Sequence, residues 1–121
     1  MLWSEVITNP YLKNLPFKIE LNRYGKIEMS PASNKRGRLQ VWFSNLLSQQ
    51  LKQGVTLIQC SIQTLEGVKV ADVVWCSKNF IKNYDYQTPY PRAPEICIEI
   101  VSPSNSKEEM FNKVSGSASK E

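Results

Sequence analysis

Two acidic residues stand in the middle of strongly apolar segments. Asp72 interrupts the run from Val68 to Cys76, and Glu99 interrupts the run from Ile96 to Val101. A carboxylate amid buried apolar side chains costs free energy unless it is paired, protonated or bound to a cation. Magnesium accepts one or two carboxylates together with water and phosphate oxygens, and a metal-held water can attack a phosphodiester. The two acids therefore predict a shared metal site, provided that their segments are neighbouring strands.

Ordinary structural roles would explain the same residues without a metal. Asp72 would then pair with a lysine, and Glu99 would be the outward residue of a half-exposed strand. A third acid, Glu20, lies on the face opposite Phe17, Ile19 and Leu21 in an alternating segment, which is typical of a solvated strand residue. The residues by themselves leave both interpretations open.

The surrounding pattern predicts an α/β fold in which strands carry the acids. Alternation and a turn at residues 23–26 predict an N-terminal β-hairpin, and branched residues predict strands over 55–63 and 68–76. The segment around Glu99 is apolar and bracketed by Pro94 and Pro103, which predicts a strand covered on both faces. Helices are expected over 2–14, from residue 35 to a C′ glycine at Gly54, over 77–84 and from 107 to 114.

The longest predicted helix combines an apolar face with a basic start. Its three-and-four spacing predicts that one face packs on the core, through Leu39, Trp42, Phe43, Leu46, Leu47 and Leu51. Lys35, Arg36 and Arg38 stand at its N-terminus, where the helix dipole disfavours positive charge. They are either a solvated helix end or a patch that faces phosphates. A net charge of +4 is compatible with a polyanionic partner.

Composition excludes several classes of protein. The absence of histidine excludes His-based catalysis and His metal ligands within this chain. Three cysteines without close spacing are expected to be buried free thiols in a reducing cytosol. Neither a signal peptide nor a membrane-spanning run is present, so a cytoplasmic protein is expected. One domain is expected over 1–114, followed by a small, polar, disordered tail over 115–121.

Several motifs together resemble the Uma-two family of restriction-endonuclease-like proteins, within the PD-(D/E)XK nuclease superfamily. The resemblance rests on Asp72 in the segment 70–74, on the block 93–104 with Glu99, Ser102, Pro103 and Ser104, and on Lys113. The segments 17–31 and 34–40 resemble the first blocks of that family. The similarity extends over about residues 10–114, and its most specific part is the Glu-x-x-Ser-Pro-Ser block.

The resemblance implies a mixed sheet flanked by helices and a DNA endonuclease site that depends on Mg2+ or Mn2+. Asp72 and Glu99 would hold the metal, Lys113 would take the role of the superfamily lysine, and Glu20 would be an additional acid. Lys35, Arg36 and Arg38 would contact DNA phosphates.

Two departures from the family pattern support an alternative. Arg36 stands where the family usually has histidine, and the family's last turn and core strand do not follow Lys113, so the domain is expected to be incomplete at its C-terminus. A missing strand would leave an exposed sheet edge that invites homodimer formation. The alternative is a catalytically inactive member that binds nucleic acid or a protein.

Overall fold

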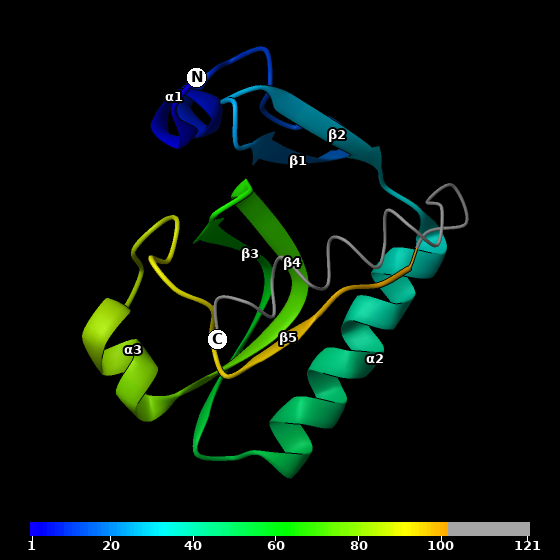
Figure 1. The fold of residues 1–121 in the computed structure, drawn as a ribbon. Helices are drawn as coiled ribbons and strands as arrows, with labels where there is room; N and C mark the ends of the chain where they lie inside the picture. Colours follow the sequence, from blue (N-terminus) through cyan, green and yellow to red (C-terminus); the bar gives the residue numbers. More distant parts are fainter. Residues whose placement is uncertain (102–121) are drawn as a thin grey trace.

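The strand β4 (Gly67–Ser77) is the central strand of the sheet, because three other strands pair with it. In this computed structural model, which describes residues 1–101, β4 pairs along its length with β3 (Gly54–Thr64). The strand order is β2-β1-β4-β3, and β5 (Ile96–Ile98) also pairs with β4 (Figure 1). All pairings between these strands are antiparallel, and the parallel pairing within 1–101 is an isolated bridge between Ile62 and Tyr90.

The predicted N-terminal hairpin is confirmed. It consists of β1 (Phe17–Asn22) and β2 (Ile27–Pro31), which pair antiparallel around a turn in which Gly25 has a φ of 75°. A left-handed conformation of this kind is easy only for glycine. The short helix α1 (Trp3–Thr8) packs on this hairpin, and Val6 forms a small apolar cluster with Leu21 and Val68.

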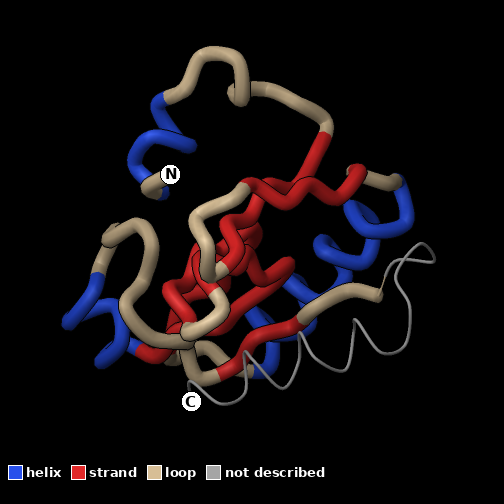
Figure 2. The backbone as a smooth tube through the Cα atoms, turned by 45° about the horizontal axis from the view of Figure 1, so that its top comes forward, coloured by secondary structure: helices blue, strands red, loops and turns tan. Residues whose placement is uncertain are grey.

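Two further helices lie on either side of the β3–β4 pair (Figures 1 and 2). α2 (Asn34–Gln50) begins at Ser33, whose hydroxyl accepts a hydrogen bond from the Arg36 N–H. α3 (Lys78–Tyr84) begins in the same way at Ser77. The α/β architecture predicted from the sequence, a sheet flanked by helices, is therefore confirmed.

The predicted packing face of α2 is only partly correct. Four of its residues are half-buried, namely Leu39, Phe43, Leu47 and Leu51, whereas Trp42 is 57% exposed and Leu46 is 39% exposed. The fully buried residues of the helix are the polar Arg36 and Gln40. Apolar spacing identified an amphipathic helix but could not show that the sheet presents a carboxylate to it. The predicted C-terminus is also wrong: the helix ends at Gln50, and Gly54 belongs to β3.

The main apolar core lies between α3 and the β3–β4 pair. Its buried members are Cys60, Ile62, Ala71, Val74, Cys76, Phe80 and Tyr90. The three cysteines are free, as predicted. Burial raises the pKa of the Cys76 thiol to about 11 and also raises the pKa of Cys60. Both thiols are therefore protonated and unreactive at neutral pH.

Some expectations fall outside the described part of the chain. Lys113, the helix expected over 107–114 and the tail expected over 115–121 all lie beyond residue 101. Within residues 1–101, no helix is long and apolar enough to cross a membrane.

Candidate functional site

The candidate site lies where two strands part on the same edge of β4. β3 occupies one edge, so β1 and β5 share the other: β1 pairs as far as Val68, and β5 pairs from Val73 onward. Extending both registers would bring Phe17 and Glu99 opposite the same residue, Asp72, so the two strands must diverge there. Side chains from β1 and from the residues after β5 fill this fork.

Asp72 lies at the centre of the fork and is completely buried. Its Oδ2 accepts a hydrogen bond of 2.8 Å from the Ile100 N–H, which fastens the chain beyond β5 to β4. Its Oδ1 lies 3.8 Å from Arg36 Nε and 3.5 Å from Gln40 Nε2, both on α2. The carboxylate therefore ties the two partners of β4, the α2 helix and the segment after β5, to one point.

The backbone of the sheet is irregular at the same place. The register between β3 and β4 pairs Ile58 with Val73 and Cys60 with Ala71, and Gln59 between them has a φ of 55°. This left-handed conformation is uncommon for a residue other than glycine. The Asp72 carbonyl accepts a hydrogen bond of 3.4 Å from Gln40 Nε2. α2 thus contacts both the backbone and the carboxylate of Asp72.

Lys18 brings Asp72 and Glu99 together. Its Nζ lies 3.1 Å from Glu99 Oε2 and 3.5 Å from Asp72 Oδ1, and the side chains of Lys18, Asp72 and Glu99 are 2%, 0% and 10% exposed. Because both oxygens lie within 3.5 Å of one nitrogen, they can be no further apart than twice that distance. The structure therefore places the two carboxylates predicted from the sequence around a common point, and a lysine ammonium lies at that point.

Glu20 lies in the fork but contacts a different part of β4. It is 5% exposed, and its Oε2 accepts a hydrogen bond of 2.6 Å from the Val70 N–H. This bond takes the place of a strand-to-strand bond where β1 has left the edge of β4. The prediction that Glu20 is a solvated strand residue is wrong. The polar face of β1, with Lys18 and Glu20, points into the fork, and Phe17 on the other face is 43% exposed.

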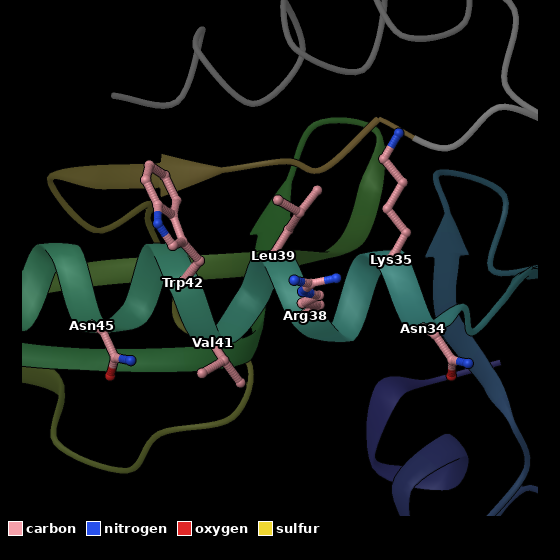
Figure 3. A pocket seen from close by; sticks show the side chains of 7 residues that line it. All are labelled: Asn34, Lys35, Arg38, Leu39, Val41, Trp42 and Asn45. Atoms are coloured by element: carbon pink, nitrogen blue, oxygen red, sulfur yellow. The ribbon is translucent and has the colours of Figure 1, made fainter.

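The three basic residues at the start of α2 separate into two groups. Arg36 is buried and faces Asp72, and its Nη1 also donates to the Pro31 carbonyl at 3.2 Å. Lys35 and Arg38 are exposed. They border a groove of about 810 Å3 on the outer face of α2, which Leu39, Val41 and Trp42 also line (Figure 3). In Figure 3, Lys35, Leu39 and Trp42 point to the same side of the helix.

The strand that carries Glu99 is shorter and less covered than predicted. β5 spans only Ile96–Ile98, and its three residues are half-buried rather than enclosed on both faces. Glu99 and Ile100 follow it and enter the fork. The apolar content of this segment therefore does not reflect burial on both faces, and that prediction is wrong.

The donor atoms fit a hard divalent ion, with one condition. Two carboxylates are a donor set that Mg2+ or Mn2+ accepts when water and phosphate complete the coordination. Within residues 1–101, however, no three or more His, Cys, Asp or Glu side chains are grouped to hold a metal. The Lys18 ammonium lies 3.5 Å from Asp72 Oδ1 and 3.1 Å from Glu99 Oε2, so it takes up the space between the two carboxylates. A hydrated ion therefore fits between the carboxylates only if Lys18 moves away.

Sequence reasoning missed Lys18 and Gln40. One signal was available for Lys18: it stands two residues before Glu20 in β1, so the two side chains share a face of the strand. A buried carboxylate on that face makes a neighbouring buried lysine plausible on charge grounds. Gln40 stands four residues after Arg36, and residues four apart in a helix lie on the same side of it. The spacing therefore placed both side chains on one side of α2.

Glu20→Gln is expected to lower the free energy of unfolding by about 1.5–3 kcal/mol, the range for a hydrogen bond to a charged group. The reason is that the amide is a weaker acceptor for the Val70 N–H. Urea denaturation followed by circular dichroism measures the change. Glu28→Gln is the matched control, because Glu28 is opposite Glu20 on β2 but exposed, and it should change stability by less than about 0.5 kcal/mol. Equal effects of the two substitutions would show that the Val70 bond is unimportant.

Comparison with known proteins supports a nuclease-like fold. The family model Uma2, described as "Putative restriction endonuclease", matches residues 7–115. A crystal structure of "a putative nuclease belonging to DUF820" from Anabaena variabilis ATCC 29413 has the same fold, with a TM-score of 0.69 at 18% sequence identity. The similarity covers 84% of this chain and 60% of that one, so this chain spans less than two thirds of its length. No curated protein matches the chain.

Proposed function

Because the chain belongs to the Uma2 restriction endonuclease family, we propose that it is a metal-dependent endonuclease domain that hydrolyses phosphodiester bonds in DNA. The observation that carries the proposal is the convergence of Asp72 and Glu99 on one point at the fork of the sheet. Two carboxylates so placed can hold Mg2+ or Mn2+, and such an ion supplies a Lewis acid and an activated water when it is bound.

The other side chains of the fork hold these carboxylates in place. The Ile100 N–H fixes one oxygen of Asp72, and Arg36 lies near the other, so the carboxylate cannot rotate without losing a partner. Glu20 fastens Val70 on the same strand, which makes its role in the proposed reaction one of positioning. Lys113, beyond the described residues, is proposed to stabilise charge that develops on the phosphate.

Substrate binding is assigned to the exposed basic residues at the start of α2. Lys35 and Arg38 are accessible and can neutralise phosphates, which makes binding dependent on salt concentration. Arg36, which was predicted alongside them, faces Asp72 in the structure. We therefore assign Arg36 to the support of the carboxylates and keep Lys35 and Arg38 as the proposed phosphate contacts.

One observation favours a second function. Lys18 already lies between Asp72 and Glu99, so the buried acids have a cation without any metal. A chain that keeps this arrangement permanently would bind nucleic acid through Lys35 and Arg38 and would not cleave it.

Cleavage of supercoiled plasmid DNA with Mg2+ or Mn2+ separates the two functions. The nuclease proposal predicts nicking by the wild type that falls to background in Glu99→Gln, an isosteric change that removes one proposed ligand. Glu95→Gln is the matched control: Glu95 lies four residues earlier, is exposed and contacts Ser77 instead, so this variant should retain activity.

Two outcomes would contradict the nuclease proposal. Equal nicking by wild type and Glu99→Gln would exclude the carboxylate site as the source of activity. Folded wild type that binds DNA in a salt-dependent manner, loses that binding in Lys35→Ala and Arg38→Ala, and never cleaves would establish the binding function instead.

A further inference from the structure

We propose that Lys18 is an internal competitor of the divalent ion: its ammonium holds the point between Asp72 and Glu99, and an ion binds there only by displacing it. This inference rests on the proposed function, because it concerns the same carboxylate pair. Lys18, a residue of β1, would then control how tightly the two carboxylates bind a metal ion.

Lys18 lies in the fork between the two carboxylates. Its side chain is 2% exposed, and its Nζ lies within 3.5 Å of an oxygen of each acid. An ammonium is a point charge of the same sign as a metal ion, and here it lies between the two oxygens. An ion that bridges Glu99 Oε2 and Asp72 Oδ1 would need the position that the ammonium holds.

The charges of the fork also disfavour an ion beside Lys18. Among the described residues, Glu20, Asp72 and Glu99 contribute three negative charges, and Lys18 and Arg36 contribute two positive charges. The described part of the fork thus carries one net negative charge without a metal. Adding a divalent ion while Lys18 stays would leave one uncompensated positive charge in a buried site, which is unfavourable. Withdrawal of Lys18 reduces this excess, so ion binding and lysine displacement are linked.

Lys18 lies where β1 is no longer paired with β4. The backbone pairing of these two strands covers Leu21 and Asn22, and Lys18 precedes them, where β1 has left the edge of β4. Neighbouring Phe17 is 43% exposed, so solvent is near the end of the strand. A lysine has a flexible four-carbon stem and a strongly hydrated head group. Rotation of the side chain can therefore carry the ammonium from the fork to water without unpairing β1.

Titration of the purified protein with Mn2+ by calorimetry tests the proposal. Lys18→Met keeps the apolar stem and removes the charge, and it is expected to bind Mn2+ about tenfold more tightly or better than the wild type, because no cation competes for the carboxylates. Lys78→Met is the matched control: it removes the same charge from an exposed lysine at the start of α3, so its affinity should equal that of the wild type. Lys18→Gln, which keeps a hydrogen-bond donor, should behave like Lys18→Met and provides a second variant should Lys18→Met not fold.

A measurement on the wild type tests the displacement itself. Lys18 should be protected from acetic anhydride in metal-free buffer and become acetylated in saturating Mn2+, as followed by mass spectrometry. Lys78, which is exposed, should be labelled equally in both conditions.

The outcomes separate this inference from the proposed function. Tighter Mn2+ binding in the Lys18 variants supports both. Equal binding in wild type and folded Lys18 variants, with Lys18 protected throughout, would overturn the competition and leave the metal site standing. Absence of Mn2+ binding in all folded variants would overturn the metal site and the inference together.

Discussion

Asp72→Ala is expected to lower the free energy of unfolding by about 3–5 kcal/mol, the cost of removing one partner from a buried ion pair. The substitution leaves Lys18 and Arg36 with less compensation for their charge, and it removes the acceptor of the Ile100 N–H. It therefore damages three contacts that join β1, α2 and the segment after β5 to one strand. An effect of this size can exceed half the stability of a small domain.

Urea denaturation monitored by circular dichroism measures this loss. Glu66→Ala is the matched control, because Glu66 forms an exposed ion pair with Arg23 at 3.9 Å, and such pairs contribute about 0–1 kcal/mol. Asp72→Asn should lie between Asp72→Ala and the wild type, since the amide oxygen can still accept from the Ile100 N–H. If Asp72→Ala cost no more than Glu66→Ala, the buried cluster would not contribute to folding.

Phe80→Ala is expected to cost about 3–5 kcal/mol through the cavity it leaves in the main core. Phe80 is 6% exposed, and its ring centroid lies 4.8 Å from that of Tyr84 and 4.9 Å from that of Tyr90. Phe17→Ala is the matched control, since Phe17 is 43% exposed and the same truncation there creates no enclosed cavity. Thermal and urea unfolding of both variants measure the difference, and equal losses would contradict this description of the core.

The same substitution should also weaken the candidate site. Tyr90 lies on the connection between α3 and β5, and its backbone exchanges hydrogen bonds with Ser61 and Gln63 of β3 at 2.9 and 2.8 Å. Packing against Phe80 keeps this connection on the sheet, and the connection sets the position of Glu99. We therefore expect folded Phe80→Ala to bind Mn2+ more weakly than the wild type, whereas Phe17→Ala should bind it at least as well.

Local patterns in the sequence determined most of the secondary structure. Alternation and turn residues identified the hairpin of β1 and β2, and the helices expected from residue 35 and over 77–84 begin within one residue of α2 and α3. The same patterns identified Asp72 and Glu99 as unusual, because a charge amid apolar residues is visible without any structure. These inferences succeeded because they depend on near neighbours in the chain and on the cost of burying charge.

Only the tertiary structure decided which groups surround these acids. Which face of β1 is buried depends on the divergence of β1 and β5 along β4, and that divergence turns Lys18 and Glu20 inward. α2 likewise presents Arg36 and Gln40 to the sheet because a buried carboxylate faces it there. Periodicity assigns side chains to faces, but charge compensation between distant segments determines which face is buried. The sequence thus located the two carboxylates, and the fold placed a lysine between them.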